Sequence, residues 1–147
     1  MAAVTLSALG ACGGTPNSEP ARGQRSQPAQ PSQSVQPTCT AVPDSLVNGI
    51  MSGAEKTAGI LRPVKSAAWR SPDYEKVWFI GVRFSATGVG EQVGVWASNS
   101  LEAGGGLILA VDGYAQQFTD WPDADKSAAK ISKADRAVAI VKQCLEG

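Results

Sequence analysis

The most regular alternation of side chains in this chain runs from Val77 to Phe84. Side chains on a β-strand point alternately to the two faces of a sheet. One face of the segment is wholly apolar and carries Trp78, Ile80, Val82 and Phe84, whereas the other carries Val77, Phe79, Gly81 and Arg83. The pattern predicts a central strand that buries its first face fully and its second face in part.

Three further strands are expected around this central strand, which itself extends to Ala86: Ile60–Trp69, Gln92–Ser98 and Leu107–Val111. Pro63 cannot donate a hydrogen bond to a neighbouring strand, so the first of the three should lie at a sheet edge. Glycines in Thr87–Gly90 and Asn99–Gly105 supply the positive φ angles that tight hairpins require. Consecutive hairpins predict an antiparallel four-stranded meander.

An amino-terminal helix is predicted over Pro43–Lys56, where apolar residues recur at helical spacing. Pro43 and Asp44 suit the first helical turn. Gly49 and Gly53 share a face of this helix, and we expect them to let it approach the sheet closely.

A carboxy-terminal helix is predicted after Ser132–Asp135, which has the spacing of a capping box with Asp in place of Glu. A short helical turn is expected over Tyr114–Phe118. The last helix has an apolar stripe of Ala134, Val138, Val141 and Leu145, with Ala137, Ile140 and Cys144 beside it. The predicted fold class is α+β, with both main helices on the face of Trp78 and its apolar companions.

Cys39 and Cys144 bracket this domain almost from end to end. In an exported protein such a pair predicts a disulfide that joins the two termini. Closing a loop of about 100 residues is worth roughly 4–5 kcal/mol in the chain-entropy model. Free thiols in a cytoplasmic protein or a metal pair are the alternatives, although two Cys without His make a poor metal site.

Composition narrows the function classes. The 147 residues contain 13 basic and 13 acidic side chains and no histidine. A net charge of zero argues against a nucleic-acid partner. The absence of histidine removes Ser-His-Asp and Cys-His catalysis and most transition-metal sites. We therefore expect neither a cofactor nor a metal. Separately, no apolar run in the sequence approaches the roughly 20 residues of a membrane-spanning helix.

The segment Leu9-Gly10-Ala11-Cys12 resembles a bacterial lipobox, in which two small residues precede an obligatory cysteine. The resemblance implies that Cys12 receives diacylglycerol and that the peptide is cut before it. No Lys or Arg precedes Cys12, so we expect the true start of translation to lie upstream of Met1.

The segment after Cys12 is rich in Pro, Gln and Ser and contains no aromatic residue as far as Pro37. Such a composition cannot bury enough apolar surface to offset chain entropy. We expect a signal remnant over 1–11, a lipidated Cys12 with a disordered tether over 12–38, and one folded domain over 39–147. This layout resembles small surface lipoproteins of high-GC Gram-positive bacteria, some of them carried by prophages.

Two groups of polar residues are candidates for a catalytic or a metal site. Ser127 and Lys130 match the Ser-x-x-Lys spacing of penicillin-recognising enzymes, but none of the other motifs of that class follows. A second group of carboxylates consists of Asp112, Asp120, Asp123 and Asp125. It could bind calcium or serve glycoside hydrolysis, but its spacing is not that of an EF-hand. For both constellations a solvated loop is the simpler interpretation.

The stronger candidate is a binding face on the second side of the sheet, made of Phe79 and Arg83 with Gln92 and Trp96 on the next strand. Aromatic rings and arginine dominate interface energetics. The alternative is that Phe79 and Trp96 complete a core.

The sequence thus predicts a non-enzymatic, lipid-anchored protein on the extracytoplasmic side of the membrane. Its partners would be the bilayer, through the lipid on Cys12, and an envelope component or protein. A prophage-type superinfection-exclusion lipoprotein is an alternative, and an envelope hydrolase working through the carboxylates or Ser127 and Lys130 is another.

Overall fold

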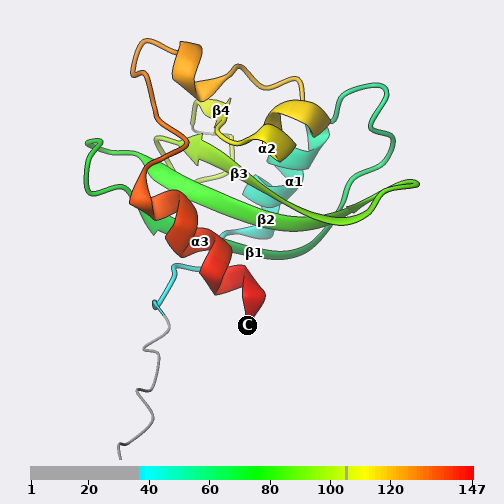
Figure 1. The fold of residues 1–147 in the computed structure, drawn as a ribbon, viewed down its shortest axis with the longest axis horizontal. Helices are drawn as coiled ribbons and strands as arrows, with labels where there is room; N and C mark the ends of the chain where they lie inside the picture. Colours follow the sequence, from blue (N-terminus) through cyan, green and yellow to red (C-terminus); the bar gives the residue numbers. More distant parts are fainter. Residues whose placement is uncertain (1–36, 105) are drawn as a thin grey trace, which may run out of the picture. The chain divides into compact units, whose positions relative to one another are not determined.

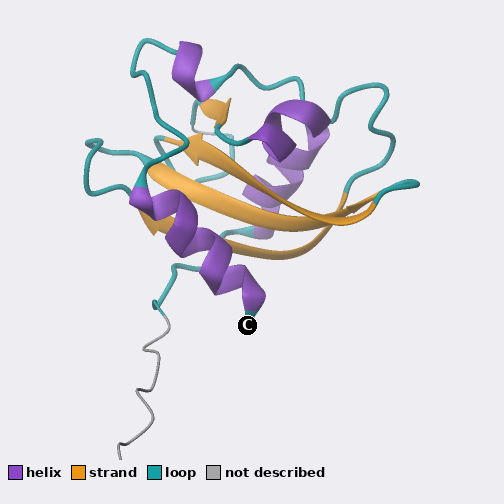
Figure 2. Cartoon of the chain, in the orientation of Figure 1, coloured by secondary structure: helices purple, strands orange, loops and turns teal. Residues whose placement is uncertain are grey.

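The computed structural model describes residues 37–104 and 106–147. Cys12 and the predicted tether up to residue 36 lie outside the described residues. In chain order the elements are α1 (Asp44–Ser52), β1 (Arg62–Arg70), β2 (Trp78–Ala86), β3 (Gly90–Ser98), β4 (Ile108–Ala110), α2 (Gly113–Phe118), the 3₁₀ turn η1 (Ala124–Lys126) and α3 (Arg136–Glu146). Figures 1 and 2 show this arrangement.

The sheet is the predicted antiparallel meander, with strand order β1-β2-β3-β4. The hairpin between β2 and β3 places Ala86 opposite Gly90. Gly88 and Gly90 take φ angles of 80° and 84°, which a tight connection favours and a side chain would resist. Pro63 lies on edge strand β1, where the register with β2 shifts between Pro63 and Lys65. The α+β class and the meander are therefore confirmed.

Helices cover both faces of the sheet. On one face, α1 and α2 pack over a core that includes Ile80, Phe84 and Trp96. On the other face, α3 packs over a second core that includes Phe79 and Val95. Figure 1 shows α3 on the opposite side of the strands from α1 and α2. The prediction that both main helices share one face is wrong.

The reason is that the second face of β2 is apolar once its neighbours are counted. Phe79 lies opposite Ala97, and Gly81 lies opposite Val95. Four apolar or small positions thus meet there and require cover, and the apolar stripe of α3 supplies it with Ala137, Val138, Val141 and Leu145, all buried.

Gly81 sets how closely α3 approaches the sheet. A Cβ added at Gly81 would lie 3.0 Å from Leu145 Cδ1 and 3.3 Å from Val141 Cγ2. Both distances are shorter than ordinary van der Waals contact between carbon atoms. The missing side chain therefore lets α3 lie almost directly on the backbone of β2.

Helix α1 is shorter than predicted, since it ends at Ser52 with Gly53 as its C-cap. Gly49 has nothing within 4 Å of an added Cβ, so the expectation that it permits close approach to the sheet is wrong. At Gly53 the neighbour is the indole of Trp121 rather than the sheet. Trp121 Nε1 donates to Ile50 O at 2.8 Å, which satisfies one of the last carbonyls of the helix.

The disulfide between Cys39 and Cys144 is present, with the two Cα atoms 6.3 Å apart. It joins the segment before α1 to the last turn of α3. Because these elements cover opposite faces of the sheet, the bond links the two outer layers of the domain. Among the described residues, no helix combines the length and the apolar character needed to cross a bilayer.

Candidate functional site

The four residues of the predicted binding face do not share a face. Gln92 lies opposite Phe84 and Trp96 lies opposite Ile80, so both point to the α1 side. Phe79 and Arg83 point to the α3 side. The predicted phase between the two strands is therefore wrong, because directly opposed residues of an antiparallel pair project to the same face.

Burial also removes the two aromatic residues from solvent. Phe79 and Trp96 are both 0% exposed. The Trp96 indole lies over Gly94 and donates from Nε1 to Thr119 Oγ1 at 3.2 Å. Arg83 is half-buried, and its guanidinium donates to Leu145 O in the last turn of α3. A cation suits this position, because the carbonyls at a helix carboxy terminus carry partial negative charge.

Ser127 and Lys130 do not lie on one helical turn. Ser127 is the C-cap of η1, and its hydroxyl donates to Ala124 O at 2.6 Å. Lys130 is exposed and has a positive φ of 49°. The geometry that would bring a lysine amine onto a serine hydroxyl, one turn along a helix, is absent at this segment.

The acidic residues are distributed among separate contacts. Asp123 pairs with Lys126, and this hydrogen bond and charge raise the pKa of Lys126 above its ordinary value. Within the described ranges, no three acidic, cysteine or histidine side chains gather as a metal site would require.

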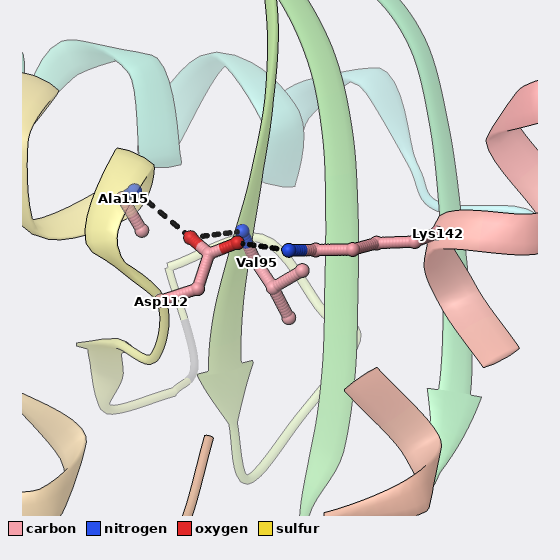
Figure 3. Close-up of polar contacts among 4 residues, drawn as sticks. All are labelled: Val95, Asp112, Ala115 and Lys142. Carbon is pink, nitrogen blue, oxygen red and sulfur yellow. Dashed lines mark hydrogen bonds and ion pairs between the residues drawn. The ribbon is translucent and has the colours of Figure 1, made fainter. Parts of the chain in front are cut away.

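Asp112 contacts three elements, β3, α2 and α3, through its carboxylate (Figure 3). Its Oδ1 accepts from Val95 N at 3.1 Å and from Ala115 N at 3.0 Å. The first bond satisfies a backbone N–H of β3 just beyond the point where its pairing with β4 ends. The second bond caps the amino terminus of α2. Its Oδ2 has no hydrogen bond of ordinary geometry, but Lys142 Nζ lies 2.7 Å away. The buried carboxylate is thus paired, and it joins α3 to β3 and α2.

An open groove of about 610 Å³ lies at the end of β1. We call it the Trp–Arg groove, and it is lined chiefly by Thr38, Trp69, Arg70, Pro72, Trp78 and Arg136. Its volume lies within the roughly 300–1,000 Å³ of ligand sites. A more apolar hollow near Leu109 and Ile131 has only about 140 Å³.

The two indoles of the groove come from opposite faces of the sheet. Trp69 lies opposite Phe79 and packs against the core under α3. Trp78 lies opposite Arg70 and packs against the core under α1. Both are half-buried, so each ring is fixed on one side by the core. The groove therefore wraps around the sheet edge with two rigid aromatic walls.

A buried polar network holds the basic side of the groove. Ser71 Oγ donates to Asp135 Oδ2 at 3.0 Å and accepts from the backbone N–H groups of Asp73 and Tyr74. Asp135 Oδ1 caps α3 by accepting from Ala137 N at 2.8 Å. The predicted capping signature therefore acts through Asp135 rather than Ser132. This network places Arg70, just before Ser71, beside Arg136, just after Asp135, in the lining of one groove.

Neither guanidinium of the groove has an acidic partner among the described residues. Arg70 and Arg136 are exposed, and no ion pair or side-chain hydrogen bond joins either one to another described residue. By contrast, Arg83 is held by a backbone carbonyl. Two uncompensated cations beside two aromatic rings form a surface that favours an anionic ligand.

Sequence reasoning missed this groove. Trp69-Arg70 at the end of a strand, followed by the Ser71-Pro72 turn, was the available signal. Arg136 is far away in the sequence and comes into place through the tertiary contacts of α3, among them the hydrogen bond between Ser71 and Asp135.

Comparison of the chain with protein-family models, with curated proteins and with solved structures finds no match. The functional argument therefore depends on the sequence and on the geometry of the domain.

Proposed function

We propose that this protein is a lipid-anchored, extracytoplasmic lipoprotein that presents a small non-catalytic binding domain at the cell envelope. The observation that carries the proposal is the Cys39–Cys144 disulfide. Disulfides form and persist in oxidising compartments and are rare in the cytoplasm. Both sulfur atoms belong to half-buried residues, so a reducing environment would have access to the bond. The disulfide thus supports export, and the lipobox-like segment ending at Cys12 supplies the anchor.

The Trp–Arg groove supports a binding role for the domain. It offers rigid aromatic walls and unpaired cations, but Trp, Arg, Thr and Pro side chains contain no general base suited to neutral pH. Such a surface can hold a ligand without transforming it. We place the binding site at this groove rather than on the sheet face predicted from the sequence.

Mass spectrometry of membrane-extracted protein tests the anchor. The gene, with its native upstream region, would be expressed in a bacterium that processes lipoproteins. We expect a mature chain that begins at Cys12 with a diacylglycerol adduct and moves to the detergent phase on extraction. The Cys12→Ala variant is the control and should lack the adduct. An unmodified amino terminus in the wild-type protein would refute the localisation.

Non-reducing peptide mapping of the same sample tests export independently, since a Cys39–Cys144 crosslink is expected in the isolated protein.

Two substitutions test the alternative of a hydrolase. Ser127→Ala and Asp123→Ala should leave any phenotype unchanged. Loss of the phenotype in a folded variant of either kind would favour a hydrolase. Superinfection exclusion stays a separate prediction, which phage integrase and repressor genes beside this gene would support.

A further inference from the structure

We propose that the Trp–Arg groove binds a segment of anionic polysaccharide, with sugar rings on Trp69 and Trp78 and acid groups on Arg70 and Arg136. This inference rests on the proposed function, because that function places the groove at an envelope surface where such polymers occur. It adds the chemical class of the ligand.

Charge is the first argument for an anionic ligand. Arg70 and Arg136 line the same groove and have no ion-pair partner among the described residues. The carboxylate next to Arg136 in sequence, Asp135, is only 8% exposed. Its two oxygens already accept from Ser71 Oγ and Ala137 N, so it is not aimed at the guanidinium. Guanidinium groups bind carboxylates and phosphates through paired, charge-assisted hydrogen bonds.

The aromatic walls are the second argument. Each indole is anchored on one side by a core cluster, so little conformational entropy is lost when a ligand packs on the other side. The faces of pyranose rings present C–H groups that pack on the electron-rich face of an indole. Thr38 and Thr40 line the same groove, and threonine hydroxyl groups can exchange hydrogen bonds with sugar hydroxyls.

The edge of β1 argues against an acidic peptide. Extended peptides commonly bind by adding a strand to an open sheet edge. Here Thr40 already occupies that edge, because Thr40 N donates to Ala68 O at 2.9 Å and Ala68 N donates to Thr40 O at 2.8 Å. Strand addition is therefore blocked at Ala68, and we expect a ligand in the groove to be recognised through rings and charges.

Calorimetric titration of the oxidised full chain carrying Cys12→Ser tests the inference without the lipid. The probes are oligogalacturonate, the same oligosaccharide with its carboxylates methyl-esterified, a phosphate-bearing glycan, poly-glutamate, and phosphatidylglycerol vesicles. We expect binding of the oligogalacturonate or the phosphate-bearing glycan, weaker binding with added salt, and at least tenfold weaker binding of the esterified oligosaccharide.

The arginines are tested by Arg70→Gln and Arg136→Gln. Each should weaken binding by about tenfold, as expected for loss of a charge-assisted hydrogen bond. Arg62→Gln is the matched control, because Arg62 is an exposed arginine at the opposite end of β1 and should leave binding unchanged. Arg136 is the first residue of α3, where a positive charge is unfavourable, so its removal should not unfold the domain.

Several outcomes would overturn the inference. These are absence of binding to both acidic glycans, equal binding of the esterified oligosaccharide, equal or tighter binding of poly-glutamate or the vesicles, or an equal effect of Arg62→Gln. Because the Cys12→Ser protein carries no lipid, a failure of glycan binding can be distinguished from a failure of anchoring at Cys12.

Discussion

Ser71 and Asp135 form a hydrogen bond of 3.0 Å between a hydroxyl and a carboxylate that are both buried. The bond ties the connection between β1 and β2 to the first turn of α3. Arg70 and Arg136, which are next to the two partners in sequence, line one groove beside this bond. A single polar contact therefore connects the packing of the domain to the site that we propose.

Replacing Ser71 by Ala should destabilise the domain by about 1–3 kcal/mol, because Asp135 Oδ2 and the backbone N–H groups of Asp73 and Tyr74 lose their partner. Urea denaturation followed by tryptophan fluorescence measures the change. Ser132→Ala is the matched control, since the Ser132 hydroxyl accepts from Ala134 N at an exposed site. Equal denaturation midpoints for the two variants would contradict the assigned role of Ser71.

Removing the disulfide with Cys39→Ser and Cys144→Ser together should cost about 4–5 kcal/mol, since the crosslink closes a loop with a sequence separation of 105. Both cysteines line a surface hollow of about 270 Å³, so a reductant can reach the disulfide. Reduction of the wild-type protein should therefore destabilise the domain by the same amount. Denaturation curves with and without reductant check this. A reductant-sensitive midpoint in the double variant would show that the effect arises elsewhere.

Gly81→Val should destabilise the domain by about 1–3 kcal/mol, because the new side chain must displace Leu145 and Val141 of α3. Gly49→Ala provides the opposite case. Its site in α1 is open, so the substitution should stabilise the domain by up to about 1 kcal/mol through helix propensity. Thermal unfolding measures both. A destabilising Gly49→Ala would mean that α1 packs more closely than described.

Asp112→Ala should cost about 3 kcal/mol or more, because it leaves Val95 N and Ala115 N without an acceptor and Lys142 without its counterion. Asp112→Asn should cost less, since an amide oxygen can still accept both hydrogen bonds. Lys142→Met leaves the buried Oδ2 of Asp112 without its partner, and we expect a cost of about 1–3 kcal/mol. Chemical denaturation should show that Asp112→Ala lowers the free energy of unfolding more than Asp112→Asn or Lys142→Met does.

Local patterns predicted the elements and the meander. The apolar alternation of β2, the glycines of the hairpin and the stripe on α3 each follow from contacts that are close in sequence. The pairing of Cys39 with Cys144 was also predictable, because these are the two cysteines in the predicted folded domain. The structure contains these features because local backbone geometry and the burial of apolar side chains favour the same elements.

The relation between faces of neighbouring strands was not predictable in the same way. The connection of Thr87, Gly88 and Val89 places Ala86 opposite Gly90, and this register puts Phe79 with Ala97. A change of one residue in the connection would exchange every face of β3. The sequence pattern of each strand is compatible with either phase, and for this reason the residues of the predicted binding face point in opposite directions.

The kinds of element, their order and the crosslink could be predicted from the sequence, since they depend on short-range periodicity and on a few chemically distinctive residues. Which helix covers which face, and where the proposed binding surface lies, depends on contacts between residues that are far apart in the sequence. The Trp–Arg groove depends on Trp69, Trp78 and Arg136 meeting around one sheet edge. That meeting depends on the strand register and on the Ser71–Asp135 contact, both of which join residues through space.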